Sequence, residues 1–168
     1  MKTRVRTLTS NDYEAVKEIE KIVVNEYLDY LKEMNEQDTI EPWITPQYFD
    51  HYLKTENSSV AEINGKVVGF ILAQPTSYLR GAKREVWLEY IAVKPESRKM
   101  GIGSMLISRT VERAQSHGVK LLHTTLNPNN SESARLLEKH GFDVKDWKEA
   151  KRELTEGEGT RMRRKSHE

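Results

Sequence analysis

The sequence predicts an α+β fold in which helices flank a central, twisted, mixed but mostly antiparallel sheet. The first observation is Asn64-Gly65, which lies between β-rich runs over 60–63 and 66–74 and is the strongest short-range hairpin signal. The second is the helical spacing of apolar residues over 11–24. The third is a strand-like run over 84–93, which a glycine-containing loop joins to another helical segment. This order of elements indicates one layered domain.

Length and composition favour a single domain over residues 1–168. The chain has 168 residues, which is long enough for a real core, and it shows no internal repeat and no linker rich in proline or serine. Apolar residues make up 36% of the chain and charged residues 32%. We therefore expect a modest core under a very polar surface, and the clear apolar periodicity argues against disorder.

The charge balance and the absence of cysteine exclude several classes of protein. The formal net charge is +1, so the chain has no broad basic field for nucleic acid. The lack of cysteine removes disulfides, thiolate metal sites and cysteine nucleophiles, and we expect no metal site. The N-terminus has no apolar signal core, and no run approaches the ~18 apolar residues of a membrane span. We expect a cytoplasmic monomer or homodimer with no nucleic-acid or membrane partner.

The N-terminal half begins with a short strand over 3–8, where apolar and polar residues alternate. Ser10-Asn11-Asp12 is typical of a helix start. The apolar stripe that follows continues to Met34, either as one long helix or as two. Proline residues interrupt it, and Thr45-Pro46 starts a short helix because proline is tolerated in the first turn. The expected buried side of this helix contains Tyr48, Phe49, Tyr52 and Leu53.

The C-terminal half alternates strands and helices. A helix over 104–117 should end at Gly118, and a strand should follow over 121–126. Asn129-Asn130 has the chemistry of a helix N-cap, and that helix should stop at Gly141. The remaining expectations are a strand-like region at Phe142, Val144 and Trp147, and, over 151–168, a charged loop followed by a terminal edge strand or a basic tail.

The run from Val86 to Gly103 carries the clearest functional signal. Pro95 ends the strand because it lacks an N–H group, and a basic loop over 98–103 leads directly into the next helix. Strand, glycine loop and helix in this order aim backbone N–H groups and a helix N-terminus at an anion. Gly101 and Gly103 allow the backbone to approach that ligand closely. We interpret the loop as a pyrophosphate-binding site.

This loop and its surroundings resemble the GNAT superfamily of acetyl-CoA-dependent N-acetyltransferases. Arg98-Lys99-Met100-Gly101-Ile102-Gly103 is similar to the family's Gln/Arg-x-x-Gly-x-Gly/Ala signature. A glycine-rich hexapeptide alone is weak evidence, but several further blocks occur in the right order. They are the hairpin over 63–69, the strand end Ile91-Ala92-Val93-Lys94-Pro95, and the later group of Asn130, Ala134 and Gly141-Phe142.

The resemblance implies a GNAT fold with acetyl-CoA as co-substrate and no metal. It implies that Ile91, Ala92 and Val93 pair their backbone with the pantetheine arm, and that an N–H group there polarises the thioester carbonyl. Asn130 would cap its helix and contact the pantetheine, although Asn127 is an alternative. The residues implied at the pyrophosphate are Arg98, Lys99, Met100, Gly101, Ile102, Gly103 and Ser104, where the alternative for Arg98 is a solvated surface charge.

The family's reaction is direct attack of an amine on the thioester, and it needs a base because alkyl amines are mostly protonated at neutral pH. Glu89 is the candidate base, since strand parity places it on the same face as Ile91 and Val93. Its setting also resembles polyamine-type family members that carry a glutamate there. The alternative is a solvated glutamate paired with a lysine, and the residues favour neither.

One position departs from the family pattern. Leu137 stands where a tyrosine often protonates the departing thiolate, so the thiolate either leaves unaided or receives help from Ser133 or Tyr90. His123 and His140 are other acid–base candidates, but no partner lies at a meaningful spacing, and we expect mainly structural or surface roles.

We therefore expect an N-acetyltransferase that acts on a primary amine, either a protein N-terminus or lysine or a small polyamine-like amine. We favour a protein acceptor slightly, because nothing in the sequence indicates a strongly anionic pocket for a small cation. The rival function is a non-catalytic acyl-CoA-binding regulatory module, which Leu137 suggests. The acceptor should lie between the early helices and the sheet, over the aromatic residues Tyr27, Tyr30, Trp43, Tyr48 and Tyr78, whose alternative role is core packing.

Overall fold

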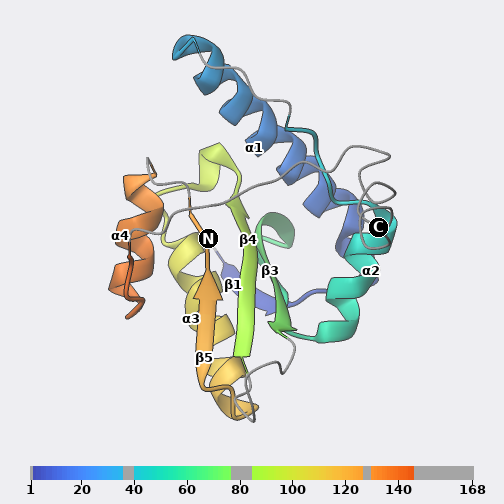
Figure 1. Cartoon of the computed structure of the whole chain (residues 1–168). Helices are drawn as coiled ribbons and strands as arrows, with labels where there is room; N and C mark the ends of the chain where they lie inside the picture. Colours follow the sequence, from blue (N-terminus) through green and yellow to red (C-terminus); the bar gives the residue numbers. More distant parts are fainter. Residues whose placement is uncertain (1, 36–39, 77–84, 127–129, 146–168) are drawn as a thin grey trace, which may run out of the picture.

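The computed structural model describes residues 2–35, 40–76, 85–126 and 130–145 (Figure 1). Within them, one sheet of five strands has the order β1-β2-β3-β4-β5. β1 to β4 pair antiparallel and β5 pairs parallel with β4, which confirms the mixed, mostly antiparallel sheet. The strands are β1 (Thr3–Thr7), β2 (Ser59–Ile63), β3 (Lys66–Thr76), β4 (Glu85–Val93) and β5 (Leu121–Thr124).

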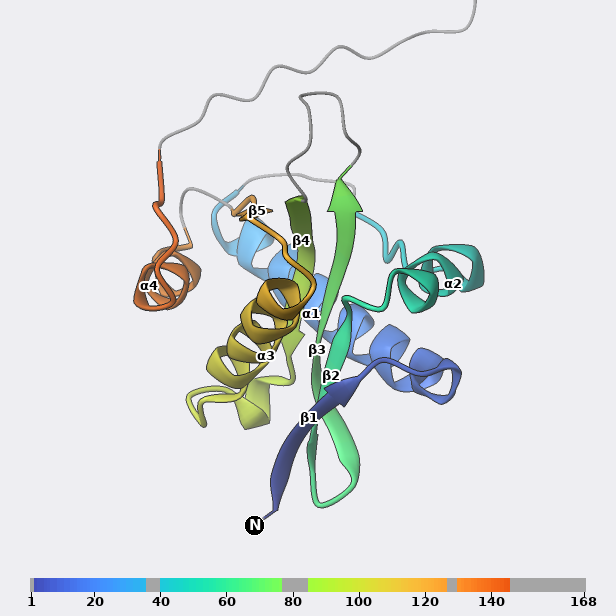
Figure 2. The same ribbon diagram turned by 90° about the horizontal axis from the view of Figure 1, so that it is seen from below.

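The helices cover both faces of the sheet, as Figure 2 shows. The helices on one face are α1 (Tyr13–Glu33) and α2 (Pro46–Thr55), and those on the other are α3 (Ile102–Ser116) and α4 (Ser131–Lys139). The turns η1 (Ser10–Asp12) and η2 (Pro95–Ser97) are short 3-10 helices. The α+β prediction is confirmed, and the stripe that ends near Met34 is one continuous helix, α1.

Two apolar cores result from this arrangement, one on each face. Side chains of β3 alternate between them: Phe70 and Leu72 pack under α1 and α2, while Ile71 and Ala73 pack under α3. The hairpin between β2 and β3 is confirmed. Asn64 and Gly65 have φ angles of 51° and 81°, as a tight turn with two left-handed residues requires.

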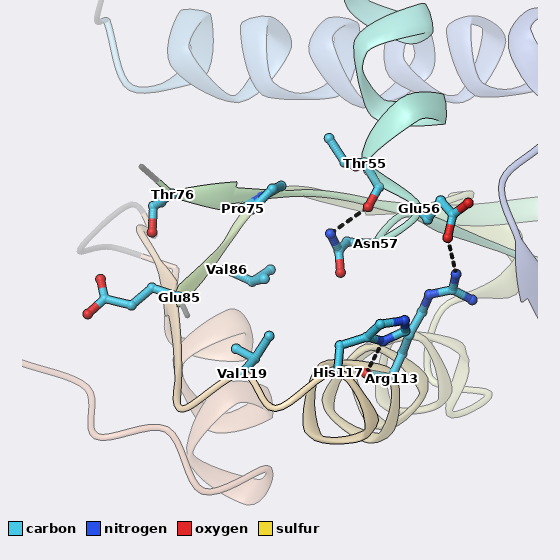
Figure 3. A pocket seen from close by; sticks show the side chains of 10 residues that line it. All are labelled: Thr55, Glu56, Asn57, Pro75, Thr76, Glu85, Val86, Arg113, His117 and Val119. Atoms are coloured by element: carbon cyan, nitrogen blue, oxygen red, sulfur yellow. Dashed lines mark hydrogen bonds and ion pairs between the residues drawn. The ribbon is translucent and has the colours of Figure 1, made fainter. Parts of the chain in front are cut away.

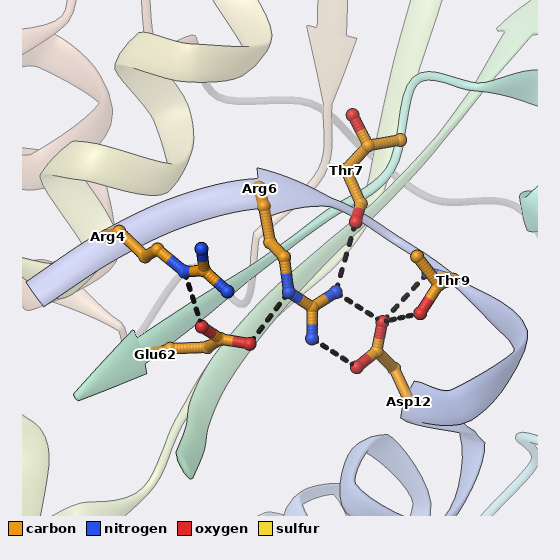
Figure 4. A network of polar contacts seen from close by, with 6 residues as sticks. All are labelled: Arg4, Arg6, Thr7, Thr9, Asp12 and Glu62. Atoms are coloured by element: carbon orange, nitrogen blue, oxygen red, sulfur yellow. Dashed lines mark hydrogen bonds and ion pairs between the residues drawn. The ribbon is translucent and has the colours of Figure 1, made fainter. Parts of the chain in front are cut away.

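A polar network fastens β1 to its neighbours (Figure 4). The guanidinium of Arg6 donates to Asp12 of η1 with two bonds of 2.7 Å and to Glu62 of β2 with a third bond of 2.7 Å. Arg4 donates to the other oxygen of Glu62, also at 2.7 Å. Burial disfavours ionisation of Asp12, but hydrogen bonds from Arg6 and Thr9 outweigh it and lower its pKa. The hydrogen bond from Arg4 is the main cause of the lowered pKa of Glu62.

The C-terminal prediction is wrong in one part. Phe142 and Val144 pack against the core under α3, but residues 142–145 form no strand. Their apolar side chains therefore reflect packing and not pairing with the sheet. Trp147 and the segment over 151–168 lie outside the described residues, so the expected edge strand or basic tail stays a prediction.

Candidate active site

The centre of the candidate site is the unpaired side of β4. β5 pairs with β4 only over Glu85–Leu88, so the rest of β4 has no strand partner on that side within the described residues. The N–H of Lys94 donates to Val68 of β3 at 2.8 Å. Because N–H directions alternate along a strand, the N–H groups of Ile91 and Val93 point away from β3, toward the unpaired side.

The glycine loop brings a helix N-terminus next to this edge. Lys99 and Gly101 have φ angles of 61° and 79°, and α3 begins at Ile102. The first helical bond runs from Met105 N–H to Gly101 at 3.0 Å. The N–H groups of residues 102–104 precede it and have no partner within the helix, so this end of α3 carries partial positive charge. The strand, loop and helix predicted from the sequence are therefore confirmed as neighbours.

Glycine is required at the two loop positions for different reasons. A Cβ atom on Gly101 would meet nothing within 4 Å, so this glycine is needed for its positive φ. A Cβ atom on Gly103 would lie 3.0 Å from the Cδ2 atom of Leu136 in α4. Gly103 therefore allows α3 and α4 to pack closely.

Arg98 is neither a free surface charge nor turned toward the loop. Its guanidinium donates to both carboxylate oxygens of Glu26 in α1, at 2.7 and 2.6 Å. Its Nε atom also donates to the carbonyl of Val93, at 3.1 Å, on the unpaired side of β4. Lys94 makes a parallel contact to Glu18, at 2.8 Å. Two ion pairs thus join the loop region to α1.

The other side chains predicted at the cofactor are mostly engaged in the fold. The side chains of Ala92 and Ile102 are buried, and those of Ile91 and Val93 are half-buried against the core under α3, so these four residues offer a ligand mainly their backbone. The side chains of Lys99 and Met100 are exposed. Ser104 Oγ lies 2.7 Å from His140 Nε2, and Asn130 accepts a 3.0 Å bond from the N–H of Ser133 as the N-cap of α4.

Glu89 occupies a β-bulge. Leu72 pairs with Tyr90 and Ala73 with Leu88, so Glu89 has no partner on β3. The bulge reverses the alternation of β4, because Leu88 packs on the α3 face while Tyr90, two residues further on, packs on the α1 face. The expectation that Glu89 shares a face with Ile91 and Val93 is therefore wrong. Its carboxylate lies on the side of α1 and α2.

The carboxylate of Glu89 is held by neutral donors and not by a lysine. The Tyr52 hydroxyl donates to Oε2, and the Gln74 amide donates to Oε1. Burial and then the nearby Glu89 raise the pKa of Tyr52, so its hydroxyl keeps its proton. His51 Nε2 lies 2.6 Å from Gln74 Oε1. Gln74 and His51 are not predicted as site residues from the sequence, where the available signal is a glutamine at the end of the apolar run of β3.

An aromatic wall stands beside Glu89 on the same face. Trp43 stacks on Tyr90 with a centroid distance of 5.6 Å and contacts Tyr48 edge-on at 5.5 Å. Tyr27 and Tyr30 form a separate stack on α1. The predicted acceptor region is therefore split into two aromatic groups, and Tyr78 lies outside the described residues.

The carboxylate of Glu20 holds the Trp43 segment in place. Its side chain is fully buried and accepts hydrogen bonds from the N–H groups of Trp43, at 2.8 Å, and Ile44, at 3.1 Å. Burial raises the pKa of Glu20, although the two N–H donors act in the opposite direction. Burial, with a smaller effect of Glu20, also raises the pKa of Tyr90.

The remaining acid–base candidates have structural partners. Leu137 is buried under α3, so this position offers no proton donor. His123 lies 3.1 Å from Glu85 and stacks on Trp87, and His140 contacts Ser104. The expectation that the histidines lack partners is wrong, and their structural role is supported. A pocket of about 210 Å³ next to Arg113 and His117 lies at the opposite end of β4 (Figure 3).

No group of His, Asp or Glu side chains suited to a metal ion occurs within residues 2–35, 40–76, 85–126 and 130–145. Among the helices of these same ranges, none has the length and apolar character needed to cross a membrane.

An open-edged strand followed by an anion-binding loop and helix defines a class of acyl-CoA-binding fold. Residues 16–142 match the acetyltransferase (GNAT) family, and the chain belongs to this family. It is 39% identical over 79 residues to an L-2,4-diaminobutyric acid acetyltransferase of Nocardia farcinica, a match that covers 46% of this chain and 39% of that protein. It is 30% identical over 102 residues to an uncharacterized N-acetyltransferase of Methanocaldococcus jannaschii, covering 59% of this chain and 45% of that one. The chain thus spans less than half of these two relatives.

Solved structures share the fold. A transcriptional regulator from Bacillus halodurans C-125 superposes with a TM-score of 0.67 at 23% identity, covering 91% of this chain and all of that one. An aminoglycoside N-acetyltransferase in complex with CoA superposes with a TM-score of 0.66 at 18% identity, covering 90% of this chain and all of that one.

Proposed function

We propose that this protein is an acetyl-CoA-dependent N-acetyltransferase that acetylates a primary amine. The observation that carries the proposal is the unpaired side of β4, where the N–H groups of Ile91 and Val93 adjoin the N-terminus of α3. A chain of amides suits this edge because it can pair as a strand does. The pyrophosphate of acetyl-CoA suits the free N–H groups of residues 102–104.

The chemistry assigns a task to each part of the site. Acetyl-CoA supplies the acetyl group as a thioester. Glu89 takes one proton from the ammonium of the acceptor, directly or through water, and the free amine forms a C–N bond at the thioester carbonyl. The N–H of Ile91 or Val93 donates to the carbonyl oxygen while it gains charge. The C–S bond then breaks, the new amide nitrogen gives its second proton to water, and water protonates the thiolate because Leu137 has no proton to give.

The acceptor is a primary amine that enters from the side of α1 and α2, where Glu89 and the Trp43–Tyr90 stack lie. The sequence favours a protein N-terminus or lysine. The relative that is named for L-2,4-diaminobutyric acid favours a small diamine. Both classes of acceptor should be assayed, and the amine that causes release of CoA is the acceptor.

The first experiment measures binding and turnover separately. Acetyl-CoA and CoA should raise the melting temperature, because a ligand at 100 times its Kd stabilises the fold by about 2.7 kcal/mol. Release of CoA is then measured against peptides, diaminobutyrate, polyamines and aminoglycosides. The absence of any stabilisation by either ligand contradicts the proposal.

Glu89→Gln tests the base. We expect kcat to fall roughly 10²- to 10⁴-fold with unchanged affinity for acetyl-CoA, since general-base catalysis is lost while the cofactor edge stays intact. Glu138→Gln, on the exposed side of α4, is the matched control and should retain full activity. A Glu89→Gln enzyme with the wild-type rate between about pH 6 and 9 would remove Glu89 from the mechanism.

The rival function is a non-catalytic acyl-CoA-binding module, and the buried Leu137 is the observation that favours it. This function predicts stabilisation by acetyl-CoA without CoA release on any amine of the panel. The same two measurements therefore separate the two functions.

A further inference from the structure

Three elements converge on the carboxylate of Glu89. Tyr52 and His51 come from α2, Gln74 comes from β3, and Glu89 itself lies on the bulge of β4. Tyr52 and Gln74 each bond a different carboxylate oxygen, and His51 bonds Gln74. Glu89 is nevertheless exposed, and exposed glutamates are usually solvated and rotate freely. The convergence therefore requires an explanation.

The direction of this hydrogen-bond chain follows from its chemistry. An ionised carboxylate only accepts hydrogen bonds, so the amide nitrogen of Gln74 faces Glu89. The amide oxygen then faces His51, and it too can only accept. His51 Nε2 must therefore carry the hydrogen over the 2.6 Å contact, in the neutral or in the charged ring. The chain runs from His51 through Gln74 to Glu89.

The bulge explains why Glu89 needs such support. Glu89 has no partner residue on β3, and the pairing of β5 with β4 ends at Leu88, so the ladder is interrupted at Glu89 on both sides within the described residues. A base at such a position is oriented only by its side-chain contacts. Misplacement of a reacting group by about 1 Å can cost about 100-fold in rate.

We propose that Gln74 is a positioning residue, which, supported by His51, orients the carboxylate of Glu89 toward the acceptor amine. The inference rests on the proposed function, because it takes Glu89 as the base. Gln74 itself does not touch the reacting atoms. It acts through Glu89, and His51 acts through Gln74.

The test is a double-mutant cycle between Gln74→Met and Glu89→Gln. Methionine keeps the length of the glutamine side chain but removes its N–H donors. We expect Gln74→Met to lower kcat about 10- to 100-fold, with unchanged Kd for acetyl-CoA and unchanged melting temperature. In the Glu89→Gln background the same change should have no further effect on kcat, because the group that it orients is already lost. Gln47→Met, an exposed glutamine of α2, is the matched control.

His51 supplies a second arm. His51→Phe keeps a ring beside Tyr52 but removes the donor, and it should lower kcat about 3- to 10-fold. His51→Gln keeps an N–H donor and should restore most of that loss, which a purely structural role of the ring does not predict.

The outcomes separate this inference from the proposed function. If Glu89→Gln leaves kcat unchanged, the base itself is wrong and the inference falls with it. If Glu89→Gln slows turnover but Gln74→Met does not, only the positioning role is overturned. The positioning role is also overturned if the decreases in kcat caused by Gln74→Met and Glu89→Gln multiply in the double variant, because independent roles combine in that way.

Discussion

Glu20 shows how one buried residue shapes the acceptor side of the site. A carboxylate without exposed surface is costly unless it is bonded, and the N–H groups of Trp43 and Ile44 provide the bonds. These bonds hold the backbone at Trp43 and Ile44, and so hold the indole of Trp43 over Tyr90. A polar residue far from the chemistry thus sets the position of an apolar wall next to it.

Glu20→Gln gives a prediction with a defined sign. The pKa of Glu20 is raised above its ordinary value of 4.5, so above that pH the folded chain binds a proton more tightly than the unfolded chain. The free energy of unfolding of the wild type therefore falls as pH rises through this range. At pH near 4 the variant should be less stable than the wild type by about 1–3 kcal/mol, because its amide nitrogen replaces the oxygen that accepts the 3.1 Å bond from Ile44. This difference in stability should become smaller as pH rises. Urea unfolding at several pH values measures the difference in the free energy of unfolding between wild type and variant. A difference that grows as pH rises would contradict the raised pKa of Glu20.

Among single residues, the sequence predicts Glu89 as the candidate base but places it on the wrong face of the sheet. A strand pattern assumes unbroken alternation, and a bulge of one residue reverses it without changing any apolar spacing. Gln74 and His51 were missed because they are distant in sequence from Glu89 and carry no motif. For Arg98 the sequence predicts either a phosphate contact or a solvated charge, because no local pattern indicates its pairing with the distant Glu26.

At the scale of elements, two arginines of β1 add ion pairs to its ladder with β2, and they differ in the burial of their partners. Arg6 faces two almost fully buried carboxylates, Asp12 and Glu62, whereas Arg4 contacts Glu62 from an exposed position. Glu62 keeps one partner when either arginine is removed, but Asp12 keeps its ion pair only while Arg6 is present. The two arginines therefore form a natural comparison on a single strand.

We predict that Arg6→Met destabilises the fold by about 3–5 kcal/mol, because it leaves a buried carboxylate without its cation. Arg4→Met is the control and should cost no more than about 1 kcal/mol, as exposed ion pairs do. Urea unfolding at neutral pH measures both values. Equal losses for the two variants would show that burial of Asp12 does not decide the effect.

Gly69 sets the distance between the sheet and α3. A Cβ atom there would lie 2.9 Å from the carbonyl oxygen of Ala92 and 3.3 Å from the Ile102 side chain. We predict that Gly69→Ala costs about 1–3 kcal/mol of stability and weakens binding of acetyl-CoA, because Ile102 is the first residue of α3. Gly65→Ala, at the hairpin, is the control: it should cost about 1–2 kcal/mol through its positive φ alone and leave binding unchanged. Calorimetric titration distinguishes the two variants.

Most elements could be predicted because their signals are local. Asn64-Gly65, Pro46 and Gly118 each fix a turn or a helix end through their own backbone preferences. The failures concern long-range packing. Phe142 and Val144 have the spacing of a strand, but they face the core under α3 without pairing to the sheet, and local spacing cannot distinguish these arrangements.

At the scale of the whole molecule, the sheet separates two tasks. The face under α3 and α4 supports the glycine loop, which is the proposed anion site, and the face under α1 and α2 holds Glu89, the proposed base, and the aromatic wall. The side of β4 that β5 leaves unpaired beyond Leu88 lies between these two faces. The sequence predicted the layers and the loop, because the GNAT pattern is local; the division of tasks between the faces required the structure.

The two ion pairs between α1 and the loop region have a further consequence. Arg98–Glu26 and Lys94–Glu18 are partly exposed and add little to stability, yet they join α1, on the proposed acceptor side, to the loop region, on the proposed cofactor side. A ligand that breaks one of these ion pairs on one side of the site therefore changes the free energy of ligand binding on the other side. Thermodynamic reciprocity then requires the amine to change the affinity for acetyl-CoA by the factor by which acetyl-CoA changes the affinity for the amine. Since partly exposed pairs are screened by ions, this cooperativity should decrease as ionic strength rises.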